Sequence, residues 1–205
     1  MRIVFATNNE AKAREARQVL GSFEIPVLTL KDLDIVSDPD ESGETFAENS
    51  RIKALDVYRI LKERGGMADT VVIADDSGLC IDYLGGEPGV RSARFMGHST
   101  SYNEKNREIL RLLEDAGDGE RGAAFVCHVC AVDEYGRVYD AESSMPGEIA
   151  HEPKGEEGFG YDPIFYVPEF GMTSGELTPE QKNSISHRGK VLRKMREILC
   201  QNQLL

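Results

Sequence analysis

The chain has 205 residues, of which 40% are hydrophobic and 29% are charged, and this composition predicts a single globular domain with a real core. The net charge of −12 argues against a nucleic-acid surface, because phosphate backbones are bound by clustered Lys and Arg. No apolar stretch approaches the roughly 20 residues that span a bilayer, and no signal peptide precedes the first strand-like run, so we expect a cytoplasmic protein.

The N-terminal segment predicts a strand over residues 2–6, a polar loop, and a helix with apolar residues Ala16, Val19 and Leu20. Free N–H groups at a helix start, together with the helix dipole, attract phosphate groups. The alternative is a simple N-cap beside a solvated lysine, which the lack of Walker or Rossmann glycines favours. The loop and helix start consist of Thr7, Asn8, Asn9, Glu10, Ala11 and Lys12.

An acidic loop over residues 37–43 follows a short strand predicted near residues 26–29. Thr45 and Glu48 form a capping box that begins a helix, so we discount Glu48 as a catalytic carboxylate. Glu41 has no such structural role and is a candidate carboxylate. Lys53, in the predicted helix, is a candidate hydrogen-bond donor to a phosphate group. The alternative is a solvated lysine.

The stretch around Asp75 and Asp76 is the most informative one in the chain. Residues 71–74 form a β-branched run typical of a buried strand, which we expect to end at the two carboxylates. In open α/β sheets ligands bind beyond the carboxyl ends of strands, so both carboxylates should face a crevice while Gly78 lets the backbone turn. The alternative is an ordinary strand followed by an Asx-turn.

The middle of the chain predicts further sheet strands. The glycine-rich residues 84–94 predict an ordered loop, and Ser101 and Glu104 cap a following helix. Strands over residues 123–132 and 138–145 should form a hairpin around the turn at residues 133–136, which gives a mixed sheet. We expect all four cysteines to be reduced thiols; Cys127 and Cys130 have zinc-like spacing but no second pair.

Residues 155–163 interleave glycines with aromatic residues and precede a strand over residues 164–167. Glycines allow a flat ligand to approach closely, Phe159 and Tyr161 can stack on it, and Asp162 can accept its N–H groups. The alternative is an aromatic-rich turn that closes a core. The last segment begins an amphipathic helix beside Lys182, His187 and Arg188.

Together these features predict a nucleoside polyphosphate site. It would combine cationic side chains that donate hydrogen bonds to phosphate, a carboxylate cluster suited to a hard cation, and a site of aromatic and glycine residues for a nucleobase. The donors are Lys12, Lys53, Lys182 and Arg188, and the carboxylates are Glu41, Asp75 and Asp76.

Four motifs in register, spread over essentially the whole chain, resemble the inosine triphosphate pyrophosphatase family, also called the non-canonical purine NTP or XTP/dITP diphosphatases. The motifs are Thr7-x-Asn9-x-x-Lys12, Ala74-Asp-Asp-Ser-Gly-Leu79 with Gly85-Gly-x-Pro-Gly89 and Ser92-Ala-Arg94, Gly158-Phe-Gly-Tyr-Asp-Pro163, and Ile185-Ser-His-Arg188. The resemblance implies Mg²⁺-dependent hydrolysis of ITP, dITP and XTP to the monophosphate and pyrophosphate, which removes deaminated purines from the nucleotide pool. It implies a homodimer and an α/β fold, with a long central mixed β-sheet flanked by helices and the active-site cleft between two lobes of one domain, residues 1–205.

The resemblance also implies roles for individual residues. Asp76 falls at the catalytic base, and Glu41 and Asp76 fall at the metal ligands; the residues by themselves leave open whether Asp76 is base, ligand or both. The substrate contacts are Thr7, Asn8, Asn9, Glu10, Ala11, Lys12, Lys53, Ser77, Phe159, Gly160, Tyr161, Asp162, Lys182, His187 and Arg188. Asn8 replaces a frequent glycine, and because Asn tolerates positive φ we expect the turn to be kept.

Substrate choice follows from hydrogen bonding. A 6-oxo purine offers an acceptor where adenine offers an amino donor, so donors from His187 and Arg188 should reject ATP. Two alternatives remain: a nucleotide-binding regulatory protein without turnover, and a pyrophosphatase for pyrimidine or methylated nucleotides.

Overall fold

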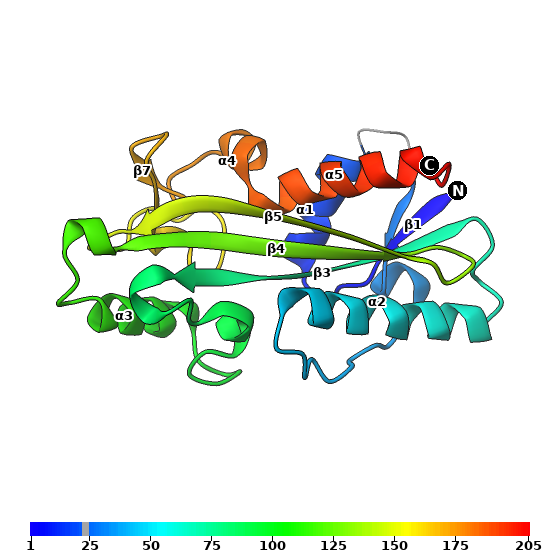
Figure 1. The fold of residues 1–205 in the computed structure, drawn as a ribbon, viewed down its shortest axis with the longest axis horizontal. Helices are drawn as coiled ribbons and strands as arrows, with labels where there is room; N and C mark the ends of the chain where they lie inside the picture. The colour runs from blue at the N-terminus through cyan, green and yellow to red at the C-terminus, as the bar shows by residue number, and fades with distance from the viewer. Residues whose placement is uncertain (22–24) are drawn as a thin grey trace. The chain divides into compact units, whose positions relative to one another are not determined.

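The structure, a computed structural model, describes residues 1–21 and 25–205 (Figure 1). The strands are β1 (Arg2–Phe5), β2 (Val27–Thr29), β3 (Thr70–Ile81), β4 (Gly122–Val132), β5 (Val138–Ile149), β6 (Phe165–Val167) and β7 (Met172–Thr173). The α-helices are α1 (Glu10–Leu20), α2 (Phe46–Glu63), α3 (Tyr102–Leu112), α4 (Pro179–Ile185) and α5 (His187–Gln201). Short 3₁₀ helices are η2 (Lys31–Leu33), η3 (Asp82–Leu84), η4 (Gly89–Arg94), η5 (Asp118–Glu120) and η6 (Asp162–Ile164).

The strands of the described residues form one seven-stranded sheet in the order β2-β1-β3-β4-β5-β6-β7. Strand β1 pairs in parallel with both β2 and β3, whereas β6 pairs antiparallel with β5 and β7. The predicted mixed sheet of an α/β fold is therefore confirmed. The predicted hairpin is also present, since β4 and β5 are neighbours joined by a short turn in which Gly136 N–H donates to Asp133 O at 3.0 Å.

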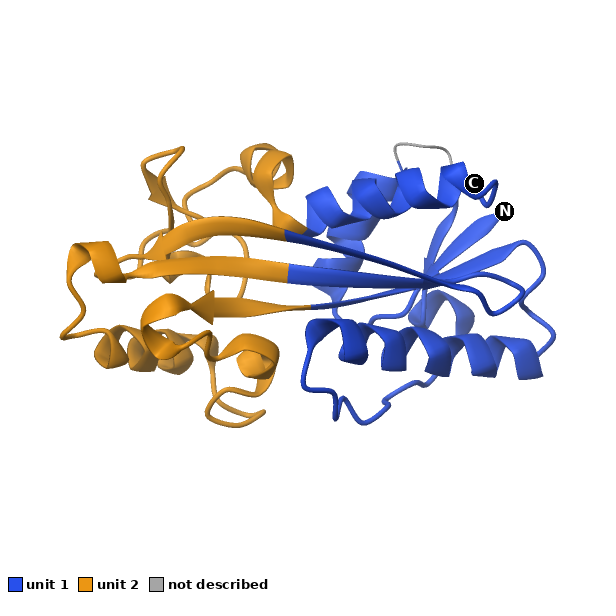
Figure 2. Cartoon of the chain, in the orientation of Figure 1, with its two compact units in different colours: residues 1–76, 127–143, 188–205 blue, residues 77–126, 144–187 orange. Residues whose placement is uncertain are grey.

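The chain divides into two compact units (Figure 2). Unit 1 contains residues 1–76, 127–143 and 188–205, and unit 2 contains residues 77–126 and 144–187. Strands β3, β4 and β5 each contribute residues to both units. A single domain with a cleft between two lobes stays a prediction.

In unit 1, alternate residues of β1 and β3 point to opposite faces of the sheet, as the period of a strand requires. Helices α1 and α5 pack on one face, against Ile3, Phe5, Val71 and Ile73. Helix α2 packs on the other face, against Val4, Ala6, Val72 and Ala74. Both faces of these strands are therefore buried, which is why their sequences are continuously apolar.

Unit 2 has its own core. Ile109 of α3, Phe125 of β4 and Phe165 of β6 are buried there with Leu79 and Ile81 of β3. The rings of Phe125 and Phe165 lie 4.4 Å apart between centroids. Ser101 and Glu104 form the predicted capping box of α3.

The prediction that the central strand ends at Asp75 was wrong, because β3 continues to Ile81 and Gly78 makes no turn. Strand β4 is the neighbour of β3 on the side away from β1, so β3 keeps a partner after β1 has ended. Strand β1 stops at Phe5, which is paired with Ile73. The two carboxylates therefore lie beyond the end of β1, although they remain inside β3.

Three smaller differences concern the length and regularity of elements. The predicted loop over residues 84–94 contains the last residue of η3 and the whole of η4. Strand β5 extends to Ile149, four residues past its predicted end, and η6 covers the first residue of the strand predicted at 164.

Candidate active site

Asp75 is a buried carboxylate on the face of β3 that α1 and α5 cover. Its Oδ2 lies 3.0 Å from Lys12 Nζ of α1 and 3.0 Å from Arg188 Nε of α5. Cys127 Sγ approaches the same oxygen at 3.8 Å. Burial alone would raise the pKa of Asp75, but Lys12 and Arg188 outweigh it and hold that pKa well below its usual range. Asp75 is therefore charged at neutral pH and anchors two cations.

Asp76 lies on the opposite face of β3, toward α2. Lys53 Nζ is 2.9 Å from its Oδ1, and Asn49 Nδ2 donates to its Oδ2 at 3.4 Å. Burial raises the pKa of Asp76, and the charges of Lys53 and Lys12 offset only part of this rise. A carboxylate whose pKa is raised accepts a proton more effectively near neutral pH, which is the property of a general base.

Glu41 contacts the same lysine from the acidic loop. Lys53 Nζ lies 3.0 Å from Glu41 Oε2, so one ammonium group joins Glu41 to Asp76. Burial lowers the pKa of Lys53, but the charges of Asp76, Asp75 and Glu41 outweigh burial and raise it. The structure thus brings together the two residues predicted as metal ligands.

A divalent cation fits this pair of carboxylates. Glu41 and Asp76 already share one cation, the ammonium group of Lys53, which shows that their oxygens can converge on a positive charge. Within the described residues, no group of three or more His, Cys, Asp or Glu side chains is arranged to hold a metal ion. Mg²⁺ often takes only one or two carboxylates from a protein and its remaining ligands from substrate phosphates and water.

The predicted phosphate loop joins β1 to α1. Asn9 is the N-cap of α1, and its Oδ1 accepts from Ala11 N–H at 2.9 Å and from Lys12 N–H at 3.2 Å. Thr7 Oγ1 accepts from Asn9 N–H at 3.1 Å. The N-cap alternative thus holds for Asn9. The same alternative also proposed a solvated lysine, and this part is wrong, because Lys12 pairs with Asp75.

Two other residues of the predicted phosphate loop, Asn8 and Glu10, make contacts that the sequence did not predict. The chain bends at Asn8, but its backbone stays outside the left-handed region, so the turn is made without the positive φ that we expected. Instead, Asn8 Nδ2 donates to Ser37 O at 3.1 Å, which ties the loop to the start of the acidic segment. Glu10 is exposed and pairs with Lys31 at 3.3 Å.

Unit 2 contains a second polar cluster, centred on the buried Asp162. Its Oδ2 accepts from Phe159 N–H at 2.7 Å and pairs with Lys182 Nζ at 2.5 Å, while its Oδ1 accepts from Ser174 Oγ at 2.8 Å. Lys182 Nζ lies 5.0 Å from the centroid of the Phe159 ring. Phe159 is 37% exposed, so one of the two aromatic residues predicted to stack on a base has accessible surface.

Tyr161 matches the alternative that was left open, an aromatic turn that closes a core. It is 3% exposed, its hydroxyl donates to Ser92 O at 2.8 Å, and it packs edge-on against Tyr102. The neighbouring Gly160 has φ +72, a conformation that favours glycine, and its carbonyl accepts from Asn106 Nδ2 at 3.2 Å. Stacking of Tyr161 on a ligand has no support in this arrangement.

His187 and Arg188, which begin α5, face different surroundings. His187 belongs to unit 2 and stacks on Phe125 at 5.1 Å between ring centroids. Arg188 belongs to unit 1, where it pairs with Asp75 and with Glu15. Ser77 is the half-buried residue of β3 that follows Asp76. The described partners of Arg188 are the carboxylates of Asp75 and Glu15. The predicted contact of Arg188 with a purine therefore stays a prediction.

Two residues that contact this cluster were missed from the sequence. Glu15 pairs with Arg188, and Asn49 contacts Asp76. A helical spacing could have pointed to both, since Glu15 lies three residues after Lys12 on α1 and Asn49 lies four residues before Lys53 on α2.

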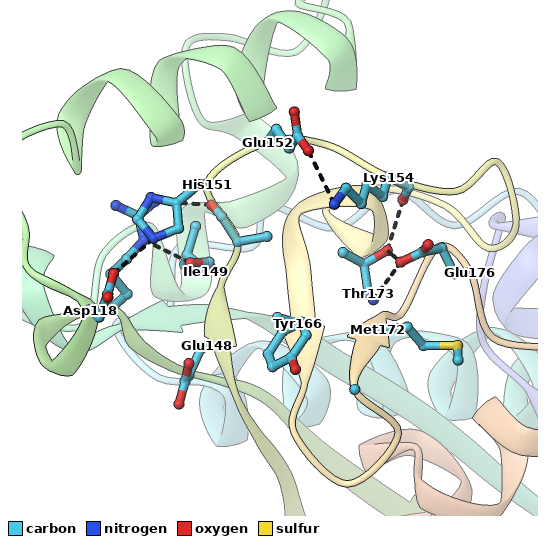
Figure 3. Close-up of a pocket in the computed structure, with 13 residues that line it drawn as sticks. Asp118, Glu148, Ile149, His151, Glu152, Lys154, Tyr166, Met172, Thr173 and Glu176 are labelled. Carbon is cyan, nitrogen blue, oxygen red and sulfur yellow. Dashed lines mark hydrogen bonds and ion pairs between the residues drawn. The ribbon is translucent and has the colours of Figure 1, made fainter.

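A pocket of about 560 Å³ opens elsewhere in unit 2 (Figure 3). In it, exposed His151 pairs with Asp118 at 3.0 Å and Lys154 pairs with Glu152 at 3.1 Å. None of the predicted site residues lines this pocket, so it forms no part of the candidate active site.

The fold and the cluster around β3 define an α/β protein with a charged site beyond the end of a parallel strand, the position where such folds bind anionic ligands. The chain belongs to the Ham1 family, whose model matches residues 3–198. It is 41% identical to a dITP/XTP pyrophosphatase of Clostridium perfringens, over 97% of each chain, and 44% identical to one of Treponema denticola, over 94% of this chain and 95% of the relative.

Solved structures agree with this assignment. A HAM1 protein from Coxiella burnetii superposes with a TM-score of 0.84 at 38% identity, covering 98% of this chain and 99% of the other. None of the helices in residues 1–21 and 25–205 is both long and apolar enough to cross a membrane.

Proposed function

We propose that this chain hydrolyses the non-canonical purine nucleoside triphosphates ITP, dITP and XTP to the monophosphate and pyrophosphate, and so clears deaminated purines from the nucleotide pool. The observation that carries the mechanism is that the adjacent Asp75 and Asp76 lie in different charge environments. Asp75 pairs with Lys12 and Arg188, whereas Asp76 pairs with Lys53. Their pKa values accordingly shift in opposite directions. Paired carboxylates whose environments separate their pKa values have separate chemical roles. The dITP/XTP pyrophosphatases among the relatives support the choice of substrate.

We assign the triphosphate group to residues of unit 1. Lys12 and Lys53 supply positive charge, and Thr7, Asn8 and Asn9 supply neutral polar groups in the loop before α1. The N–H groups of Glu10, Ala11 and Lys12 belong to the first turn of α1, where the helix dipole favours anions. Asn9 Oδ1 caps two of these N–H groups in the structure, so an anion that binds them must displace the Asn9 side chain.

Asp76 is assigned as the general base. Its raised pKa suits it to take the proton of a water molecule as that water attacks phosphorus. Glu41 and Asp76 would hold Mg²⁺, which supplies charge neutralisation on the phosphates and lowers the pKa of water when it is bound. Lys53, which pairs with both carboxylates in the structure, could then turn toward the phosphates and stabilise the departing pyrophosphate.

Asp75 has a positioning role in this proposal. It holds Lys12 beside the start of α1 and fixes Arg188, which Glu15 contacts from the other side. Ser77 continues the strand from Asp76 and is assigned to the substrate as well.

The purine base is assigned to residues of unit 2. The exposed ring of Phe159 offers a stacking surface, with Gly160, Tyr161 and Asp162 forming the turn behind it. Lys182 Nζ carries three donors, and Asp162 occupies one of them, so the others can meet the 6-oxo group of hypoxanthine or xanthine. The 6-amino group of adenine would place a donor against the donors of Lys182. A ring N–H of His187 would likewise favour a 6-oxo purine over adenine.

A substrate panel tests this function. The chain is incubated with Mg²⁺ and ITP, dITP, XTP, ATP, GTP or dUTP, and both pyrophosphate and monophosphate are measured. We expect kcat/KM for the deaminated purines to exceed that for ATP by orders of magnitude, because unpaired buried polar groups are strongly unfavourable. Guanine shares the 6-oxo group, so GTP must be rejected separately, at its 2-amino group, and we expect a preference of similar size over GTP. Equal rates on ATP and ITP, or binding without release of pyrophosphate, would contradict the proposal.

A homodimer and a cytoplasmic location belong to the same proposal. The dimer rests on the resemblance to the pyrophosphatase family. Light scattering on the 22.7 kDa chain should give about twice that mass, and a monomer mass would refute the dimer.

A further inference from the structure

Asn49 is a fully buried polar residue in the first turns of α2, and the roles assigned above do not include it. Buried amide side chains are retained in proteins only where hydrogen bonds satisfy them. The partners of Asn49 are on two other segments, the acidic loop and strand β3.

The first partner is Gly43, two residues after Glu41. Asn49 Oδ1 accepts from Gly43 N–H at 2.9 Å, and Asn49 Nδ2 donates to Gly43 O at 3.3 Å. A Cβ atom at position 43 would lie 2.7 Å from Asn49 Oδ1 and 2.6 Å from Glu48 Cβ. Only glycine allows this approach, so the loop that carries Glu41 is held directly against α2.

The second partner is Asp76. Asn49 Nδ2 lies 3.4 Å from Asp76 Oδ2, while Lys53 Nζ lies 2.9 Å from Asp76 Oδ1. Asn49 and Lys53 are four residues apart on α2, so they project from the same side of the helix and contact one oxygen each. The same amide group therefore contacts both the loop of Glu41 and the carboxylate of Asp76.

We propose that Asn49 is a positioning residue that sets Glu41 and Asp76 at the spacing at which they hold one cation. This inference rests on the proposed function, in which Glu41 and Asp76 are the metal ligands. Hydrogen bonds to metal-binding carboxylates orient them, and loss of such a partner lowers metal affinity or activity about 10-fold to 100-fold.

The experiment compares Asn49→Ala and Gly43→Ala with Ser50→Ala as the matched control. Ser50 is the adjacent buried residue of α2, but its hydroxyl donates to Ala47 O at 3.0 Å and contacts His128 Nδ1 at 2.8 Å. Three quantities are measured for each variant: the Mg²⁺ concentration for half-maximal turnover of dITP, the Kd for Mn²⁺ by electron paramagnetic resonance, and the thermal midpoint.

We expect Asn49→Ala and Gly43→Ala to weaken both Mg²⁺ activation and Mn²⁺ binding about 10-fold to 100-fold. Ser50→Ala should leave both metal measurements at the wild-type value, whatever its effect on the thermal midpoint. If Asn49→Ala lowers the thermal midpoint but keeps the wild-type Mn²⁺ affinity, Asn49 is only a structural residue and the inference is overturned.

The two proposals fail in different ways. If the wild-type chain releases no pyrophosphate from dITP, the proposed function is wrong, and the Mn²⁺ titrations still decide the role of Asn49. If turnover is present and Mn²⁺ affinity is unchanged in both Asn49→Ala and Gly43→Ala, only the positioning role is wrong.

Discussion

Asp75 and Asp76 are neighbours in the chain, yet they lie on opposite faces of β3 and their pKa values move in opposite directions. Lys12 and Arg188 hold Asp75 ionised from the side of α1 and α5. Asp76 faces α2, where burial exceeds the effect of its cationic neighbours. The alternation of a β-strand therefore separates a structural carboxylate from a chemical one.

Asp76→Asn should abolish most turnover while leaving the fold intact. The amide keeps the size of the side chain but can neither accept the proton nor provide the negative charge for a cation, so kcat should fall by about 10²-fold to 10⁴-fold. The raised pKa means that the environment disfavours the charged form, so the thermal midpoint should not fall. Turnover of ITP at saturating Mg²⁺ and one thermal melt are the measurements; near-normal turnover would show that Asp76 is not the base.

Asp75→Asn, unlike Asp76→Asn, should lower the stability of the protein. Removal of its charge leaves Lys12 without its partner and Arg188 with Glu15 alone, and breaking a buried ion pair from one side destabilises a protein by about 3–5 kcal/mol. Urea unfolding measures the free energy of unfolding directly. If this variant is as stable as Asp76→Asn, the anchoring role of Asp75 is wrong.

The pH dependence of stability should reveal the raised pKa of Asp76. Because the pKa of Asp76 is raised in the folded state, its favourable contribution is complete below the unfolded value of about 3.9 and is lost as the pH rises through the folded value. Asn cannot titrate, so the thermal midpoint of Asp76→Asn minus that of the wild type should increase with pH above about 4.

Thermal melts of both proteins in buffer with EDTA, from pH 4 to pH 8, check this dependence. The pKa of Asp75 lies well below its usual range, so Asp75 stays ionised over this pH range and does not titrate in either protein. A difference that stays constant or shrinks over this range would mean that the pKa of Asp76 is not raised.

Glu48→Ala should loosen the start of α2 with little effect on chemistry. Glu48 Oε2 accepts from Thr45 N–H at 3.1 Å and from Glu44 N–H at 2.7 Å, so the predicted capping box is confirmed. Loss of these bonds should destabilise the protein by about 0.5–2 kcal/mol. Denaturant unfolding measures the loss, and a large fall in kcat without loss of stability would instead place Glu48 in the catalytic machinery.

Local features of the fold follow directly from the sequence. The capping boxes at Thr45 and Ser101, the buried strand at Val71 and the hairpin turn at Gly136 each depend on a few neighbouring residues. Such patterns are visible in a single segment because hydrogen bonds and hydrophobic alternation act over short distances along the chain. The family motifs likewise identify the class of protein from residues at fixed spacings.

The partners of the charged side chains in the candidate site depend on the tertiary structure. Arg188 and Asp75 are separated by 113 residues, and no periodicity shows that this arginine, at the start of α5, meets a carboxylate of β3. The continuation of β3 past Asp76 was missed because β4, a strand distant in sequence, supports it. The sequence by itself predicted most of the charged residues of the candidate site, but not Glu15, which contacts Arg188. Only the packing of helices on the two faces of the sheet decided which carboxylate is neutralised by lysine and arginine and which keeps a raised pKa.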